Sequence, residues 1–439
     1  MRVLLTVMPF TGHVGPVRAV AAELVARGHQ VRVHTGSRCA APFTALGARV
    51  LPWTAAPDFD EDDLTATFPA LAGLRGPRQL LGNLEHVFLR TGAGQLEDLR
   101  AAWQQEPWDV VLGESTSTGA PLAAEATGTP WASLSLVPLS LPSRDLPPPG
   151  LGLRPWPGPV GRARDAALGA VTGLASRGLQ RAWQETRVAA GLPGPAGPVM
   201  QLWLSPHLVM ATGVPSVEHR RSDLPPQVHF VGRVQAPPPA AAGPLGLPPW
   251  WPDVEGADVP VVHVTQGTYN TDPDDLLRPA LEALAGEDVL VVAATGSAAR
   301  SELPFPVPAN ARVTGLLPYD ELLPRTAAVV TNGGWGGVLA TLAAGVPLVV
   351  AGGDLDKPEA ARRVAASGAG VDLRTGSPRP AAVGRAVREV LHEPRYREAA
   401  ARVAAQLADR GGQREVVDLL ERLVATGRPV LRAAPDPWA

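Results

Sequence analysis

The sequence predicts an α/β protein built from two doubly wound parallel sheets that face each other across a cleft. Three observations predict this class. The chain has 439 residues, enough for two domains of about 200 residues each. Apolar strand-like runs alternate with helical segments in both halves, which indicates parallel strands joined by right-handed crossovers. A proline-rich tract at residues 236–252 separates the halves and is typical of a stiff linker.

In the first half, the apolar run Val3 to Met8 predicts a buried strand, and Pro16 predicts the start of a helix that ends at Gly28. The next expected elements are strands at 30–35, 48–52, 109–113 and 131–136 and helices at 77–105, 118–127 and 162–190. Residues 138–161 are too rich in Pro and Gly for regular structure. A loop of that length is more often a binding loop than filler.

The alternation restarts after the proline-rich tract. The expected elements there are strands at 259–265, 288–294, 312–315, 327–331 and 347–351 and helices at 274–284, 336–344 and 358–367. We therefore expect an N-terminal domain at 1–235, a linker at 236–257 and a C-terminal domain at 258–415. Residues 416–439 are expected to form a helix and tail that pack back towards the first domain. Ligands of such sheets bind at the carboxyl ends of the strands.

Composition excludes several classes of protein. The net charge is −3 and the sequence has no block of Lys and Arg, which argues against a nucleic-acid partner. No run approaches the roughly 20 apolar residues of a membrane span. The one cysteine, Cys39, cannot form an intrachain disulfide, so a reducing, cytoplasmic location is the simplest expectation. The apolar N-terminus is short and has no cleavage pattern, which favours a first strand over a signal peptide.

A glycine-rich turn follows the expected strand at 327–331. Asn332, Gly333 and Gly334 precede Trp335, Gly336 and Gly337 at the start of a helix. Glycines let the backbone approach a ligand closely, and a helix N-terminus offers free N–H groups to an anion. The turn lacks both the Gly-Lys-Ser/Thr of a P-loop and a Gly-x-Gly-x-x-Gly pattern. It predicts a diphosphate cradle; the alternative is that the glycines serve tight packing of helix on strand.

This segment resembles the nucleotide-sugar motif of GT-B glycosyltransferases, whose domains are Rossmann-like. The resemblance is to the inverting family that includes antibiotic, macrolide and plant natural-product enzymes, and it covers nearly the whole chain. The family pattern is His-Gly-Gly-x-Gly-Thr, then a Glu, Gly-x-Pro and an Asp-Gln pair. The positions that match it are Gly333, Gly334, Gly336, Gly345, Pro347 and Asp356.

Three positions depart from the family pattern. Asn332 replaces the histidine that meets the diphosphate, and its amide can donate a hydrogen bond without carrying charge. Ala340 replaces a glutamate that accepts from both ribose hydroxyls in UDP-sugar enzymes, which favours a dTDP-sugar over a UDP-sugar. Lys357, the one lysine of the chain, replaces the glutamine that binds the sugar beside Asp356. It can bond a sugar hydroxyl or approach the diphosphate; alternatively it is a helix-start residue with its charge in water.

Near the N-terminus, Gly12-His13-Val14-Gly15-Pro16 resembles the family's Gly-His-x-x-Pro, whose histidine is the catalytic base. A histidine suits proton removal from a hydroxyl near neutral pH. The family holds this histidine with an aspartate, and Glu114 stands at that position. A carboxylate would fix the tautomer of the imidazole. The alternatives are a structural His13 that caps a helix and a Glu114 that faces solvent.

Other donor-binding residues follow from the same resemblance. In the stretch VHVTQGT, Thr268 is the candidate for the diphosphate, and Gln266 and Gly267 line the turn. Leu317 stands in the loop that contacts the base, although core packing explains it equally well. Asp354 and Asp356 look like a metal-binding pair, but no His or Glu completes a shell, so we expect no metal. The acidic run at 58–63 is interpreted as a solvated loop; the alternative is a cation site.

The resemblance implies an inverting glycosyltransferase that needs no cofactor. Its co-substrate would be a nucleoside-diphosphate sugar, and its acceptor a small hydrophobic molecule with a hydroxyl group. Aromatic residues that could line the acceptor pocket are Trp53, Phe59, Phe68, Phe88 and Trp156. Two alternatives stay open. One is a GT-B nucleotide-sugar epimerase, and the other is a non-catalytic nucleotide-sugar-binding or partner protein.

Overall fold

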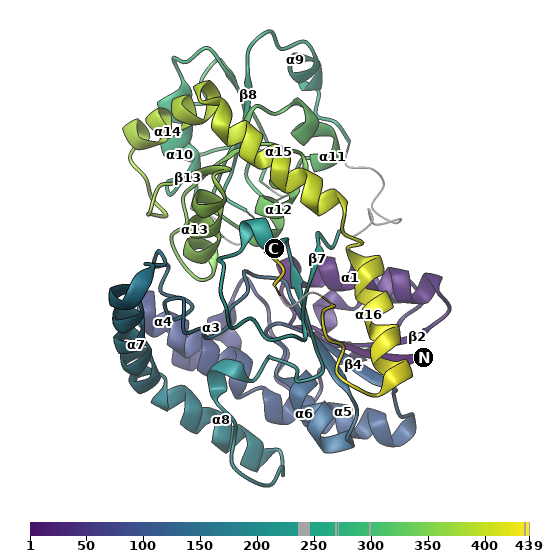
Figure 1. Ribbon diagram of the computed structural model, residues 1–439. Coiled ribbons are helices and arrows are strands. Elements are labelled where there is room, and N and C mark those ends of the chain that lie inside the picture. The colour runs from purple at the N-terminus through teal and green to yellow at the C-terminus, as the bar shows by residue number, and fades with distance from the viewer. Residues whose placement is uncertain (236–245, 268–269, 271, 298–299, 434–435, 439) are drawn as a thin grey trace.

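The computed structural model describes residues 1–235, 246–267, 270, 272–297, 300–433 and 436–438. Its chain forms two α/β units, each built on a parallel sheet, which confirms the predicted fold class (Figure 1). In both sheets the strand order reverses direction beside the first strand of the unit. Such a switch point is where open α/β sheets bind ligands, at the carboxyl ends of the strands.

The first sheet has seven strands in the order β3-β2-β1-β4-β5-β6-β7. Its strands are β1 (Arg2–Thr6), β2 (Gln30–Thr35), β3 (Arg49–Pro52), β4 (Val110–Glu114), β5 (Trp131–Ser135), β6 (Leu208–Thr212) and β7 (Val228–Gly232). The helices of this unit are α1 (Thr11–Ala26), α2 (Ala41–Thr44), α3 (Leu64–Thr67), α4 (Gly76–Asn83), α5 (Gly92–Gln105), α6 (Gly119–Thr127), α7 (Gly158–Ala175) and α8 (Arg177–Ala189). The central strand β1 pairs Val3 with Val31 on one side and Val110 on the other.

The second sheet has six strands in the order β10-β9-β8-β11-β12-β13. Its strands are β8 (Val261–Thr265), β9 (Leu290–Ala294), β10 (Ala311–Thr314), β11 (Ala328–Thr331), β12 (Leu348–Val350) and β13 (Gly370–Asp372). The helices that follow the first unit are α9 (Trp251–Glu255), α10 (Leu277–Leu284), α11 (Tyr319–Leu322), α12 (Trp335–Ala343), α13 (Lys357–Ser367), α14 (Pro380–His392), α15 (Pro394–Ala408) and α16 (Gln413–Thr426).

Several expected segments differ from the structure. The helix expected at 162–190 is α7 and α8, with Ser176 between them. The stretch expected as one helix at 77–105 is α4 and α5 separated by a π-helical turn at Leu84–Leu89. The final part of the stretch expected as a linker belongs to the second unit, because α9 buries Trp251 against Val261 and Leu290. Residues 236–245 of that stretch lie outside the described part of the chain.

The C-terminal helix α16 packs on the first unit. Val416, Leu420 and Leu423 share a buried cluster with Val3 and Leu5 of the first strand, and α16 lies beside α1 (Figure 1). The chain therefore crosses from the second sheet through α15 and returns to the first. This return ties the two units together at a second point.

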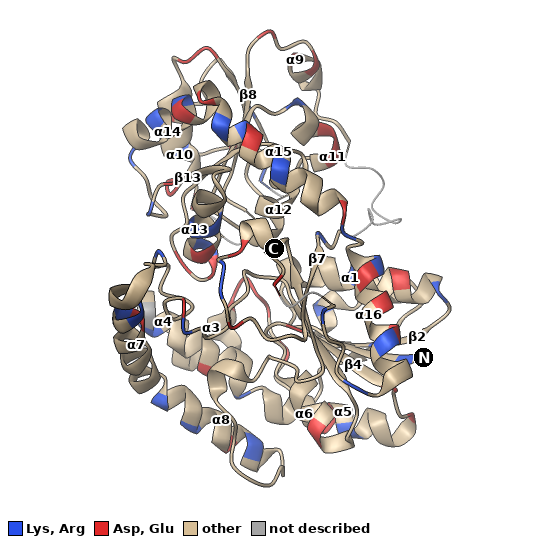
Figure 2. Ribbon diagram, viewed as in Figure 1, with Lys and Arg blue, Asp and Glu red and all other residues tan. Residues whose placement is uncertain are grey.

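Charges of both signs are spread over the helices. Both α15 and α16 carry arginines as well as acidic residues (Figure 2). Among the described residues, no helix is long and apolar enough to cross a membrane.

Candidate active site

A cavity of about 470 Å³ lies between the two units. It is lined from the first unit mainly by α1 and by the segment around α4, and from the second unit by residues that follow β8, β11 and β12. The cavity thus opens at the carboxyl ends of strands in both sheets. Residues expected from the sequence that line it are Gly12, His13, Gly267, Asn332, Gly334, Trp335, Gly336, Gly337, Asp356 and Lys357.

His13 lies in the first turn of α1 rather than in a loop before it. The helix begins at Thr11, so the expectation that it opens at Pro16 is wrong, and Pro16 lies inside the helix. The reason is a carboxylate distant in sequence. Both oxygens of Glu61 accept from the backbone N–H of Thr11 at 3.1 Å. A negative charge at this position stabilises the start of a helix.

Glu114 ends β4 and holds the imidazole of His13. The Nδ1 of His13 lies 3.0 Å from Oε2 of Glu114. The carboxylate side chain is fully buried, which excludes the alternative of a solvent-facing Glu114. Thr116 completes the carboxylate's shell with its hydroxyl at 2.6 Å and its backbone N–H at 3.0 Å. Because Nδ1 donates to Glu114, Nε2 is the nitrogen left to take a proton.

The environment changes the pKa values of both partners. Burial lowers the pKa of His13, but the charge and hydrogen bond of Glu114, with smaller contributions from Asp356 and Glu61, outweigh it, so the pKa stands above its ordinary value. Burial raises the pKa of Glu114, yet His13 and Thr116 together bring it below its ordinary value. The pair therefore favours an ionised carboxylate beside an imidazole with increased proton affinity.

The N-terminus of α12 points its backbone into the cavity. Trp335, Gly336 and Gly337 form its first turn, whose N–H groups have no partner within the helix. The N–H groups of Gly333 and Gly334 are directed instead to Thr331 Oγ1 and Asn332 Oδ1, each at 3.3 Å. The anion donors on this side therefore lie mainly at 335–337.

Gly333 is needed for the shape of the turn. Its φ is +93°, and a Cβ there would lie 2.9 Å from Val350 Cγ1. At Gly333 the glycine therefore serves tight packing on the strand, which was the alternative to a diphosphate cradle. Tight packing does not explain Gly336 and Gly337, where a Cβ would meet nothing within 4 Å.

Asn332 and Gln266 shape the cradle from within the protein. The amide nitrogen of Asn332 donates to the backbone oxygen of Gln266, which links the end of β11 to the end of β8. Gln266 is buried, and its amide donates to the backbone oxygens of Asn270 and Asp272. Asn332 still lines the cavity, whereas Gln266 acts on the loop behind it.

Asp356 and Lys357 reach the cavity at the start of α13. Lys357 is only 8% exposed, so the alternative interpretation of a lysine with its charge in water is wrong. Its Nζ lies 2.6 Å from Asp354 Oδ1. A cation at a helix N-terminus opposes the helix dipole, which calls for nearby negative charge. Burial is the main cause that raises the pKa of Asp356.

Leu317 and Thr268 are the remaining expected donor-binding residues. Leu317 belongs to a buried apolar cluster with Trp251 and Leu322 and does not line the cavity, in line with the core-packing alternative. Thr268 lies outside the described residues. Of Asp354 and Asp356, which look like a metal-binding pair in the sequence, Asp354 pairs with Lys357. The described residues include no group of His, Cys, Asp and Glu suited to a metal ion.

The structure adds polar residues that sequence reasoning did not assign. Tyr319, Thr265 and Thr331 line the cradle. The buried His263 behind them has its Nδ1 2.8 Å from Val292 O and its Nε2 3.3 Å from the Tyr319 hydroxyl. A carbonyl can only accept, so Nδ1 carries the proton and Nε2 accepts from Tyr319. Tyr319 is thereby oriented at the cavity wall.

The acidic run at 58–63 is a loop and turn in which Asp62 and Asp63 are exposed, as expected, but several of its carboxylates also bind the backbone of other segments. Besides Glu61 at α1, Asp58 accepts from the N–H of Ser37 at 2.9 Å, and Asp63 caps α3 by accepting from Ala66. These carboxylates hold backbone N–H groups that have no other partner. The acidic run is visible in the sequence, but Thr11 and Ser37, which its carboxylates bind, are distant along the chain.

The wall of the cavity beside His13 is apolar. It is formed by Phe10, Leu64, Leu80, Leu84, Val87, Phe88, Leu136 and Val137. Phe88 is the one of the five suggested aromatics that lines it. Trp53, Phe59 and Phe68 pack in a neighbouring cluster, and Trp156 is 53% exposed.

Comparison with known proteins identifies the family of this chain. Residues 278–423 match the family described as "Erythromycin biosynthesis protein CIII-like, C-terminal domain". The chain is 42% identical to 4'-demethylrebeccamycin synthase of Lentzea aerocolonigenes over 96% of this chain and 99% of that protein. It is 32% identical to UDP-glucosyltransferase B1 of Starmerella bombicola, covering 95% of this chain and 96% of that one.

A solved structure shows the same fold. The glycotransferase of kitacinnamycin superposes with a TM-score of 0.73 at 23% identity, covering 96% of this chain and 98% of that one. One relative is named a synthase and the other a glucosyltransferase, which favours a sugar-transferring enzyme over the epimerase and the non-catalytic binder. The chain belongs to the GT-B family of natural-product glycosyltransferases and transfers sugars from nucleoside-diphosphate sugar donors.

Proposed function

We propose that this glycosyltransferase moves a sugar, with inversion, from a dTDP-sugar to a hydroxyl of a small hydrophobic acceptor, with His13 as the base. One observation carries the proposal. His13, which is bonded to Glu114, lines the same cavity as an apolar wall and the N-terminus of α12. An acceptor hydroxyl can approach from the apolar side while a diphosphate lies at the helix.

The reaction is a single displacement. Nε2 of His13 takes the proton of the acceptor hydroxyl as its oxygen attacks the anomeric carbon, while Glu114 stabilises the imidazolium that forms. The bond between that carbon and the diphosphate breaks, and the electron pair stays on the phosphate oxygen. The N–H groups at 335–337 and the dipole of α12 stabilise this charge. Thr268 is proposed to assist there as well.

Asp356 and Lys357 are proposed to bind the donor. The carboxylate of Asp356 accepts from hydroxyls of the sugar. Lys357, held near a helix N-terminus against the dipole, either donates to the sugar or approaches the diphosphate. The burial of its charge at a cavity wall supports a ligand role rather than a solvated one.

The donor nucleotide is proposed to be thymidine diphosphate because of position 340. Ala340 is buried with Leu323, Val329 and Val346, next to Tyr319. In the described part of the cavity, the lining carboxylates are Glu61 and Asp356, and neither comes from the helix that carries Ala340. A ribose 2′-hydroxyl thus meets no carboxylate at position 340. Desolvating a hydroxyl without a partner costs about 1–3 kcal/mol.

Thermal shift with dTDP, dUDP and UDP at matched concentrations tests the nucleotide. We expect dTDP and dUDP to raise the melting temperature more than UDP, since ligand binding to the folded state stabilises it by mass action. Adding dUDP separates the 2′-hydroxyl from the base methyl group. The name of the UDP-glucosyltransferase relative makes UDP the alternative. A UDP shift equal to or above that of dUDP would overturn the argument from Ala340.

A further inference from the structure

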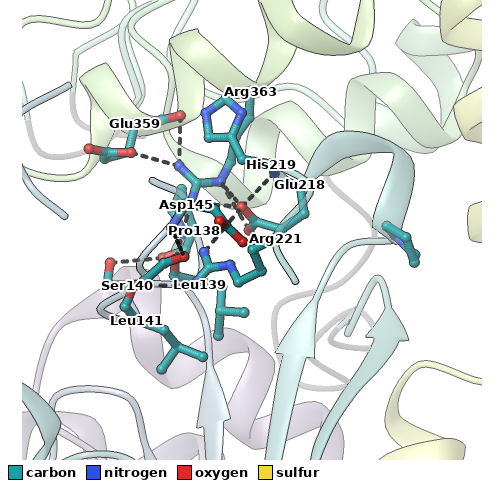
Figure 3. Close-up of polar contacts among 12 residues, drawn as sticks. Pro138, Leu139, Ser140, Leu141, Asp145, Glu218, His219, Arg221, Glu359 and Arg363 are labelled. Atoms are coloured by element: carbon teal, nitrogen blue, oxygen red, sulfur yellow. Dashed lines mark hydrogen bonds and ion pairs between the residues drawn. The ribbon is translucent and has the colours of Figure 1, made fainter. Parts of the chain in front are cut away.

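Arg363 on α13 is a buried arginine whose partners come from both units (Figure 3). Its side chain is 4% exposed. Nε donates to both oxygens of Glu218 at 2.9 and 3.0 Å, and one terminal nitrogen donates to Leu139 O at 3.1 Å. The other terminal nitrogen donates to Glu359 Oε2 at 2.8 Å and to Glu359 O at 3.2 Å.

The partners in the first unit form a short platform. Glu218 directly follows the 3₁₀ turn Pro215–Val217, between β6 and β7, and Leu139 follows β5. Arg221 supports this platform by donating to Leu141 O at 3.1 Å and lying 3.9 Å from Glu218. Arg363 therefore fastens α13 of the second unit to the first.

The same platform also holds α12. The indole N–H of Trp335 donates to Thr212 Oγ1 at 3.0 Å, and its ring packs with Val214 and Val217. The first residues of α12 and of α13 both line the cavity. One segment of the first unit, residues 212–218, thus sets the position of both helix starts relative to His13.

Glu359 connects the network to the proline-rich loop. Its Oε1 accepts from the N–H groups of Gly150 and Gly152 at 3.2 and 3.0 Å, and Arg362 Nε donates to Gly152 O at 2.7 Å. Gly152 has a φ of +57°, and a Cβ there would lie 2.7 Å from Pro358 Cβ. The loop is thereby seated on the turn that carries Asp356 and Lys357.

We propose that Arg363 is a positioning residue for sugar transfer. Through α13 it sets the place of Asp356 and Lys357 opposite His13, and so it determines how well the enzyme recognises the sugar of its donor. Burying an ion pair is a weak source of stability, whereas the planar fork of arginine fixes geometry. The inference rests on the proposed roles of Asp356 and Lys357 in sugar binding.

The test compares Arg363→Met with Arg187→Met. Arg187 on α8 is a matched control, because it is 8% exposed, bonds Glu125 at 2.5 and 2.8 Å and Pro193 O at 3.1 Å, and has these partners within one unit. Calorimetry measures the affinity of each variant for dTDP and dTDP-glucose, and for UDP and UDP-glucose. Steady-state assays then give KM and kcat for transfer with the sugar nucleotide that the wild type uses.

For R363M we expect dTDP or UDP affinity within about threefold of wild type, a loss of about tenfold or more in affinity for the sugar nucleotide, and a lower kcat. R363K should recover part of the loss, and E218Q, which keeps the shape of Glu218, should lie between. R187M should lower the melting temperature and leave affinity and kinetics unchanged. Folded R363M and E218Q that match R187M in affinity and kinetics would overturn the proposal. A wild type that binds nucleotide and sugar nucleotide equally would instead refute the proposed roles of Asp356 and Lys357.

Discussion

Replacement of His13 by alanine is expected to reduce sugar transfer by about 10²- to 10⁴-fold, the usual contribution of a positioned general base. Nucleoside diphosphate should still bind, because the N–H groups of α12 and the side chains at the ends of β8 and β11 are untouched. The assay is acceptor-dependent release of nucleoside diphosphate with a phenol acceptor. The thermal shift with dTDP or UDP shows that the variant still holds the nucleotide.

His29→Ala is the matched control for this experiment. His29 also pairs with a carboxylate, Glu421, at 2.9 Å, but it follows the far end of α1 from His13. Its loss removes a histidine–glutamate pair without touching the cavity, so turnover should stay at the wild-type level. Full turnover by His13→Ala would contradict the mechanism, whereas equal losses in both variants would indicate damage to α1 alone.

The second large effect concerns Glu114 and the dependence of activity on pH. The pKa of His13 lies above the ordinary 6.5, since Glu114 outweighs burial with the help of Asp356 and Glu61. A base works only when deprotonated, so kcat/KM should rise with pH through a midpoint above 6.5. Glu114→Gln removes the main raising charge, and burial then lowers the pKa, so this midpoint should move to lower pH.

Glu114→Gln should also lower the high-pH plateau by about 10²- to 10⁴-fold, because the imidazolium loses the carboxylate that stabilises it. Full pH profiles of kcat/KM for the wild type, E114Q and E61Q give both quantities. Glu61 contributes less to the pKa of His13, so E61Q should move the midpoint in the same direction by a smaller amount. A midpoint that stays in place in E114Q would show that His13 is not the titrating base.

The sequence predicted both sheets where strands and helices alternate, but several elements escaped it. β6 and β7 were not expected, because the connection between them has only the short turn Pro215–Val217 in place of a crossover helix. β13 has three residues, too few for a recognisable apolar pattern. A strand can be predicted from sequence periodicity only when it is long enough to show the pattern and is followed by a recognisable helix.

The candidate site likewise contains residues that the sequence could predict and contacts that it could not. His13, Glu114 and the glycine turn could be located from motifs and spacing. The structure brings His13 and the glycine turn to one cavity and bonds Glu114 to His13. The start of α1 depends on Glu61, fifty residues away, and the place of α13 depends on Glu218 and Leu139. Such partners meet only through the tertiary fold, and no spacing in the sequence shows them.

The anomeric configuration of the glycoside product tests the central claim most directly. A single displacement, in which the hydroxyl deprotonated by His13 attacks opposite the leaving diphosphate, must invert the configuration at the anomeric carbon. Proton NMR coupling constants of donor and product report this configuration. We predict a β-linked product from an α-linked sugar nucleotide; an α-linked product would contradict the mechanism.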